Sequence, residues 1–131
     1  MSALTADRST PYRDGVQFEF PVAASTKIYA GALVGVGTGT TYAAPMTAAT
    51  TWKCVGVAQE LADNSAGANA AINVKVQRGV FRFVNGESIT RASIGATAYA
   101  NDDQTVYTTS TGRSAVGTIR DVDSVGVWVE I

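Results

Sequence analysis

The chain has 131 residues and a mass of 13.6 kDa, which suits one domain with a single sizeable core. Hydrophobic residues make up 46% of it and charged residues only 16%, so the composition is that of neither a disordered protein nor a coiled coil. The formal net charge of −1 offers no basic field to neutralise phosphates, which argues against nucleic acid as a partner.

Residues 1–15 contain few core-type side chains and differ in kind from the rest. They lack the charged start and apolar middle of a signal peptide, and later apolar runs are too short to cross a membrane, so we expect a protein made and kept in a cytoplasm. One interpretation of this segment is a disordered terminus. The other is an extended arm that becomes ordered against a partner, anchored by apolar side chains and charge pairs. The candidate partner-binding residues are Leu4, Asp7, Arg8, Tyr12 and Arg13.

From residue 16 to 131 the chain shows short β-branched, alternating segments separated by Gly, Asn, Asp and Ser, with almost no helical periodicity. This pattern predicts an all-β fold, a small single-domain β-barrel or sandwich of short antiparallel strands that follows the N-terminal arm. Strands are expected at 15–22, 27–36, 40–45, 53–60, 71–84, 96–100, 105–109, 115–121 and 124–131.

Glycines alternate in the stretch GALVGVGTGTTYAAP, residues 31–45, and raise the question of a phosphate-binding loop. A dinucleotide-binding fingerprint has the pattern G-x-G-x-x-G, and a P-loop has the pattern G-x-x-x-x-G-K-[ST], in which a lysine follows the last glycine. Here Thr40 stands in place of the third glycine, no lysine follows, and no helix is indicated. We interpret Gly35, Gly37 and Gly39 as residues of a tight turn that permit a positive φ.

Two loops and one change of phase complete the predicted layout. Residues 61–71 read as an exposed loop with room for one helical turn, and residues 45–52 as a second loop anchored by Met46 and Trp52. In INVKVQRGVFRF the apolar alternation shifts after Gly79, as at a β-bulge or a barrel corner. Residues 100–106 read as a hairpin turn. The final strand is expected to bury Val125, Val127, Val129 and Ile131 on one face.

No catalytic, cofactor or metal site is predicted. The chain has no histidine, which removes Ser-His-Asp and Cys-His mechanisms and most zinc sites. Cys54, the single cysteine, cannot form an internal disulfide and is expected to be buried and unreactive. The acidic pairs Asp102–Asp103 and Asp121–Asp123 are interpreted as solvated turn residues, because they lack the further oxygen ligands of a calcium loop.

Five segments in a fixed order resemble the capsid cement, or head-decoration, proteins of tailed bacteriophages. The pattern is a V-G-V-A strand, a loop rich in small residues, V-x-V-x-x-x-G-V-F, I-x-x-G-A-x-x-Y, a turn, V-G, and a valine-rich end. The segments are ALVGV (32–36), VGVAQELADNSAGANAAINVKVQRGVFRF (55–83), SIGATAYANDDQTV (93–106), AVGTI (115–119) and VGVWVEI (125–131).

This resemblance implies a structural virion protein without enzymatic activity or cofactor. Made in the host cytoplasm, it would bind the exterior of an assembled capsid and stabilise the lattice of the major capsid protein. It would do so as a homo-oligomer, a trimer first and a dimer second, because such proteins often sit on local symmetry axes. Neither nucleic acid nor a membrane is an expected partner.

Three alternatives come from other classes of protein. The chain could be a tail- or fibre-associated β-domain, which would share this composition. It could be a glycan-binding module with an aromatic platform, or, least expected, an enzyme that uses a carboxylate, lysine or serine without histidine. The aromatic candidates for the glycan module are Tyr29, Tyr42, Trp52 and Tyr99.

Overall fold

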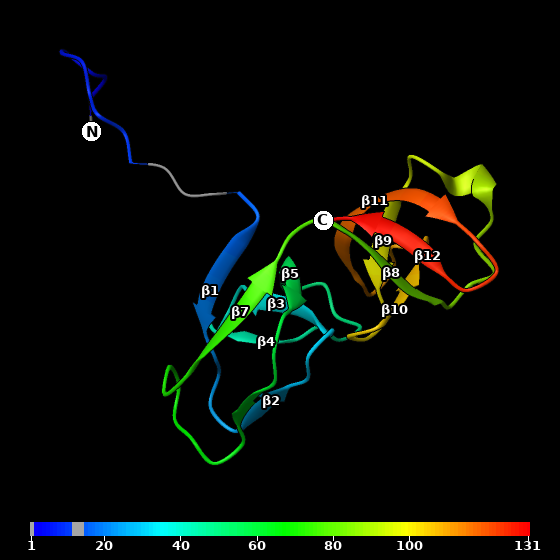
Figure 1. Ribbon diagram of the computed structural model, residues 1–131, viewed down its shortest axis with the longest axis horizontal. Helices are drawn as coiled ribbons and strands as arrows, with labels where there is room; N and C mark the ends of the chain where they lie inside the picture. The colour runs from blue at the N-terminus through cyan, green and yellow to red at the C-terminus, as the bar shows by residue number, and fades with distance from the viewer. Residues whose placement is uncertain (1, 12–14) are drawn as a thin grey trace.

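The computed structural model describes residues 2–11 and 15–131, and over these ranges the chain is all-β with one short 3-10 turn. Figure 1 shows two groups of strands side by side, with the N-terminal segment extending away from both. The elements are β1 (Gln17–Pro21), β2 (Thr26–Ile28), β3 (Leu33–Gly37), β4 (Ala43–Pro45), β5 (Trp52–Ala58), β6 (Ala62–Asn64), β7 (Asn73–Gln77), β8 (Val80–Asn85), η1 (Arg91–Ser93), β9 (Thr97–Ala100), β10 (Thr105–Tyr107), β11 (Ser114–Val122) and β12 (Val127–Glu130).

The first group is an antiparallel sheet with the strand order β1-β7-β5-β3-β4. Directly after β1, Val22 bridges Ala43 of β4, so the two ends of the sheet approach each other and the sheet curls. Small and β-branched side chains fill the space inside this curl. They are Val22, Ile28, Ala32, Val34, Ala43, Ala58, Ala62, Val74 and Val76.

The second group is a closed barrel with the strand order β10-β8-β12-β11-β9. All its pairs are antiparallel except β10 with β8, which run parallel. Because side chains alternate along a strand, Val127 and Val129 of β12 point into the barrel and are fully buried. The all-β fold predicted from the sequence is therefore confirmed, and its barrel occupies the C-terminal half.

The predicted strand 71–84 is two strands, β7 and β8, separated by Arg78 and Gly79. Gly79 has a φ of +157°, which side chains rarely adopt. The predicted change of phase at this glycine is confirmed. It marks the point where the chain leaves the curled sheet and enters the barrel.

Two other predicted segments are divided differently in the structure. The expected strand 27–36 is interrupted by a turn at Gly31, whose φ is +87°, and becomes β2 and β3. The expected loop 61–71 contains a short strand, β6, which pairs with β2. The loop prediction was wrong for these residues because a three-residue strand carries too little periodicity to be recognised.

The glycines of the β3–β4 hairpin do not adopt the positive φ that the sequence analysis expected of them. Gly35, Gly37 and Gly39 are not among the positive-φ residues, and Thr41, with a φ of 60°, takes that conformation instead. A Cβ on Gly35 would lie 3.0 Å from Cγ of Met46, so this position is glycine for lack of space. The predicted turn is confirmed, but its conformational reason was wrong.

The C-terminal strand is shorter than predicted. Val127 and Val129 are buried, but Val125 lies in the turn before β12 and its side chain is 63% exposed. The predicted burial of Val125 was wrong, because the strand alternation begins only at Val127. The hairpin turn between β9 and β10 is confirmed, as is the packing of Met46 and Trp52 against the barrel core.

Candidate interaction surface

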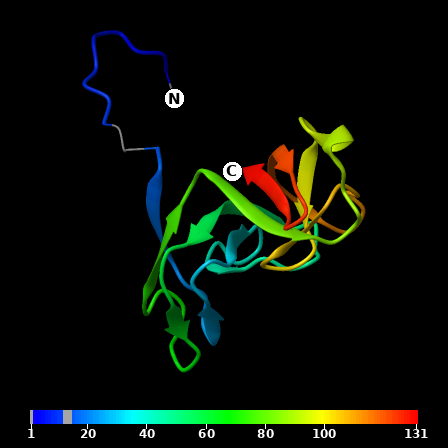
Figure 2. The same ribbon diagram turned by 45° about the vertical axis from the view of Figure 1, so that its right-hand side comes forward.

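The N-terminal arm, residues 2–11, is exposed at every position. Figures 1 and 2 show it lying apart from both groups of strands in both views. Within residues 2–11 and 15–131, no hydrogen bond or ion pair joins the arm to either group of strands. Fully extended, ten residues reach at most about 35 Å, so the arm can contact surfaces well outside its own fold.

Three of the five predicted partner-binding residues lie in this arm and face solvent. The side chain of Leu4 is 72% exposed, and Asp7 and Arg8 are exposed beside each other. The other two, Tyr12 and Arg13, lie outside the described residues. The arm thus exposes one large apolar side chain, Leu4, a few residues before a negative charge on Asp7 and a positive charge on Arg8. This composition suits a segment that binds another protein.

The arm joins the sheet beside an open hollow of about 830 Å³. Side chains of β1 and β7 line it, with Glu19 directly opposite Lys75 in the strand pairing. Gln59 and Asn73 add amide groups to its wall. This hollow is polar and shallow, and it lies on an edge strand whose outer side has no partner strand among the described residues.

Asp102, Asp103 and Asp123 lie in turns, as predicted, but Asp121 lies in β11 and forms an ion pair with Arg91 at 3.5 Å, so its prediction as a turn residue was wrong. Asp102 accepts hydrogen bonds from the N–H groups of Gln104 at 2.9 Å and Thr105 at 2.7 Å, which closes the β9–β10 turn. Partial burial, with Asp102 close by, raises the pKa of Asp103. Asp123 accepts three hydrogen bonds in the β11–β12 turn. No group of three or more Cys, Asp or Glu side chains suited to a metal ion occurs in the described residues.

Cys54 lies half-buried on β5 and packs against the barrel core. Burial raises the pKa of its thiol to about 11, partly offset by the backbone of Gly56. Since the thiolate is the reactive form, this thiol is almost entirely unreactive at neutral pH.

The four aromatic residues considered for glycan binding come from different elements. Tyr29 is 60% exposed in the β2–β3 turn, beside a hollow of about 380 Å³ that Asp103 and Gln104 also line. Trp52 packs against the barrel core, and its indole N–H donates to Thr47. The structure therefore leaves Tyr29 as the one of the four that is both strongly exposed and beside a hollow.

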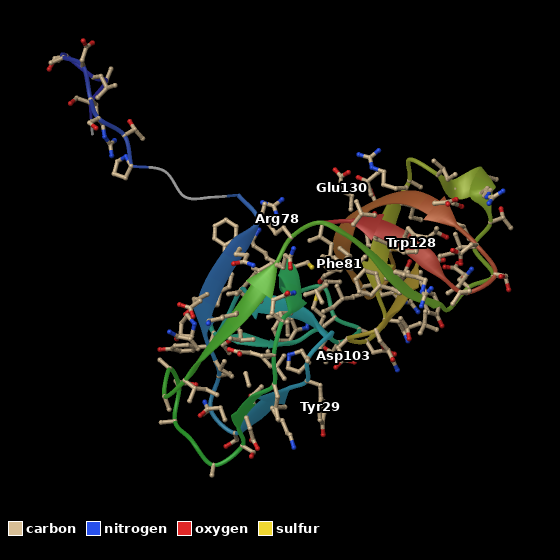
Figure 3. All side chains as sticks on the ribbon, viewed as in Figure 1. Tyr29, Arg78, Phe81, Asp103, Trp128 and Glu130 are labelled. Carbon is tan, nitrogen blue, oxygen red and sulfur yellow. The ribbon has the colours of Figure 1, made fainter. Side chains whose placement is uncertain are left out.

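Sequence reasoning missed a second exposed surface, on the outside of the barrel. Val80, Val84 and Val125 are exposed there, near Trp128 of β12. Figure 3 shows Trp128 and Glu130 along β12 on the outside of the barrel. The available signal was the alternation V-F-R-F-V in β8, whose outward positions include two valines where polar residues are more usual.

The comparisons with known proteins identify no relative: no family model, curated protein or solved structure matches this chain. Among the described residues, no helix is long and apolar enough to cross a membrane.

Proposed function

We propose that this protein is a structural component of a phage virion that binds the outside of an assembled capsid and stabilises the lattice of the major capsid protein. The observation that carries the proposal is the exposed N-terminal arm, which presents Leu4, Asp7 and Arg8 and has no hydrogen bond or ion pair to the strands within the described residues. The order of segments that resembles the cement proteins gives independent support. The proposal includes no catalytic activity.

Burial of Leu4 alone cannot hold the arm on a capsid. Burying a leucine side chain contributes about 1.5–3 kcal/mol. Fixing the backbone of each arm residue costs about 1–2 kcal/mol, so the total cost over ten residues is several times larger. The bound arm must therefore also form backbone hydrogen bonds with the capsid, and the folded body must contribute contacts of its own.

Stabilisation of the shell then follows from linkage. A ligand that binds the mature lattice, and not dissociated subunits, lowers the free energy of the assembled state in proportion to its affinity and occupancy. Many copies act on one shell, so a modest affinity per copy adds up over the lattice. The slightly acidic net charge of −1 fits a position outside the shell, where affinity for packaged DNA has no use.

The test is to mix the purified protein with expanded, undecorated capsids assembled from the major capsid protein of the same genome, and to measure occupancy by imaging and co-sedimentation. A variant lacking residues 2–11 should fold normally and fail to decorate. Leu4→Asp should weaken decoration, whereas Ser9→Asp, which adds the same charge at an exposed arm position, should have a smaller effect. Full occupancy by the truncated variant would overturn the role of the arm.

A glycan-binding module is the second candidate, and Tyr29 is the observation that favours it. Tyr29 lines the same hollow as Asp103 and Gln104, and the Lys27 ammonium lies 5.1 Å from the centre of the Tyr29 ring. An aromatic ring with adjacent hydrogen-bonding groups suits a sugar. A glycan array probed with the wild type and with Tyr29→Ala would decide, since a signal lost in the variant would favour this candidate.

A further inference from the structure

Asn85 and Gly86, at the end of β8, form the only asparagine–glycine pair in the chain. In an unfolded chain this dipeptide is the one most prone to spontaneous deamidation, because glycine has no side chain to keep its backbone nitrogen away from the asparagine amide. The other four asparagines precede serine, alanine, valine or aspartate. Asn85 is therefore the asparagine that the sequence makes most reactive, and the structure around it determines whether it reacts.

The reaction joins two groups that are adjacent in the chain. The backbone nitrogen of Gly86 loses its proton to hydroxide and attacks Cγ of Asn85, while Nδ2 takes up a proton and leaves as ammonia. A succinimide ring results. Water then adds to one of the two ring carbonyl groups and opens the ring, which leaves aspartate or isoaspartate in place of the asparagine. Water and hydroxide are the only co-reactants, and nothing is oxidised or reduced.

In the native structure both reacting groups are held by hydrogen bonds. The N–H of Gly86 donates to the carbonyl oxygen of Val106 on β10 at 3.1 Å, and β8 and β10 lie side by side in Figure 1. Nδ2 of Asn85 donates to the carbonyl oxygen of Ile89 at 2.8 Å, and Oδ1 accepts the N–H of Ile89 at 2.8 Å. Formation of the ring has to break these bonds, so Asn85 is protected while they persist.

Two further contacts anchor the segment that follows Asn85. The side chain of Ile89 is buried in the barrel core. The carboxylate of Glu87 accepts the N–H groups of Thr108 at 2.9 Å and Thr109 at 3.1 Å, and it also accepts both of their hydroxyl groups. We call residues 85–89 the Asn85 loop. Because all these contacts have to break together, the loop opens only for a small fraction of the time.

Gly86 cannot be replaced by a less reactive residue without a clash. A Cβ at this position would lie 2.6 Å from Cγ2 of Thr105 and would also collide with the ring of Tyr107. The packing of the barrel therefore requires glycine here. The fold keeps a reactive dipeptide, and its own hydrogen bonds keep that dipeptide from reacting.

From these contacts we propose that Asn85 is a deamidation site controlled by the Asn85 loop, protected while the loop is closed and modified when it opens. The aspartate product has no amide to donate to the carbonyl oxygen of Ile89, and it places a negative charge beside that oxygen. The isoaspartate product also adds a carbon to the backbone at the end of β8. Deamidation would thus turn a reversible opening into a permanent loosening of the loop. The inference does not depend on the capsid proposal.

The test measures the deamidation rate of the full chain at neutral pH, in buffer and in guanidinium chloride. Trypsin releases Asn85 in the peptide FVNGESITR, residues 83–91, which contains no other asparagine, and mass spectrometry follows its conversion. Asn85 should be the first of the five asparagines to react in the denatured chain. In the native chain it should react at least about tenfold more slowly. The free synthetic peptide, which has no loop to open, controls for the effect of the denaturant on the chemistry.

Variants of Glu87 and its partner distinguish control by the loop from the general effect of folding. Glu87→Ala removes the carboxylate that holds Thr108 and Thr109, so it should raise the native rate at Asn85 at least about threefold. Thr109→Ala removes only one hydroxyl partner and should raise the rate by a smaller factor, and it serves alone if circular dichroism shows that Glu87→Ala does not fold. Glu60→Ala is the matched control, because Glu60 is exposed and lies outside the barrel.

The outcomes decide this inference separately from the proposed function. A slow native rate that the loop variants increase and that Glu60→Ala leaves unchanged supports it, whether or not the protein decorates capsids. Equal rates at Asn85 in the native and denatured chains overturn it. So does a denatured chain in which another asparagine reacts first, or a native rate that the folded loop variants leave at the wild-type value.

Discussion

The indole Nε1–H of Trp128 donates a 2.8 Å hydrogen bond to Oδ2 of Asp123. The other carboxylate oxygen of Asp123 accepts the N–H groups of Val125 at 2.8 Å and Gly126 at 2.9 Å. One carboxylate thus connects the turn before β12 to the indole ring of Trp128 on β12. These three bonds, with that of Trp128 contributing most, hold the pKa of Asp123 below its usual value of 3.8.

This depressed pKa predicts a pH-dependent contribution to stability. A carboxyl group whose pKa is lowered by folding stabilises the fold above its unfolded pKa, and that contribution is lost as the pH falls through the folded pKa. Asp123→Asn should therefore unfold at a lower temperature than the wild type at pH 7, and the difference should shrink as the pH is lowered below about 4. Thermal unfolding across this pH range measures it. Asp7→Asn serves as the control, and a difference that persists undiminished at pH 2 would contradict the assignment.

Gly35 and Gly39 should respond in opposite ways to the addition of a methyl group. A Cβ at Gly35 would meet Cγ of Met46 at 3.0 Å and Cε3 of Trp52 at 3.1 Å, so Gly35→Ala should destabilise the fold by about 1–3 kcal/mol. A Cβ at Gly39 has nothing within 4 Å, so Gly39→Ala should be neutral or stabilising by about 0.4–1 kcal/mol. Urea unfolding compares the two, and an equal effect at both positions would refute the packing explanation.

Asn64 at the end of β6 holds together three parts of the curled sheet. Its buried side-chain amide donates to the carbonyl oxygens of Ala23 and Ala68, both at 2.9 Å. Asn64→Ala would remove the donor to the Ala23 carbonyl and leave the Ala68 carbonyl with only the N–H of Ala71, at 3.2 Å, and it should cost about 1–3 kcal/mol in unfolding free energy. Asn73→Ala, at an exposed position on β7, should change it by less than about 0.5 kcal/mol. Similar losses in both variants would argue against this role.

The raised pKa of Cys54 predicts slow alkylation. With a pKa of about 11, the thiolate fraction should increase about tenfold per pH unit from pH 7.5 to 9.5, and the rate of reaction with iodoacetamide should follow it. Mass spectrometry of the native protein over time gives this rate. An ordinary exposed cysteine levels off above about pH 8.5, and the same levelling in Cys54 would contradict the burial argument.

Much of the fold could be predicted from the sequence, because a long alternating segment indicates where a strand lies and which of its side chains point into the core. β1, β9, β10 and β12 fall within expected strands, and the break at Gly79 was visible as a change of apolar phase. Short elements could not be predicted. β6 has three residues, too few to show alternation, and it exists because its backbone pairs with β2.

The surfaces were harder to predict than the strands, since exposure depends on where each strand begins. Val125 is in phase with buried Val127 and Val129, and only the Asp123 turn shows that it lies outside the strand. Arg82 and Trp128 meet only because β8 pairs with β12, a pairing between residues about 45 positions apart. The N-terminal residues stand out in composition, because they contain few core-type side chains, but their role as a binding arm stays a prediction.

Electron cryo-microscopy of expanded capsids mixed with the full chain and with the variant lacking residues 2–11 tests the central claim most directly. The account predicts ordered density on the outer surface of shells with the full chain, density that continues into the arm and contacts a major-capsid subunit, and bare shells with the truncated variant. Bare shells with both proteins, or the same density with the full chain and with the truncated variant, would contradict it.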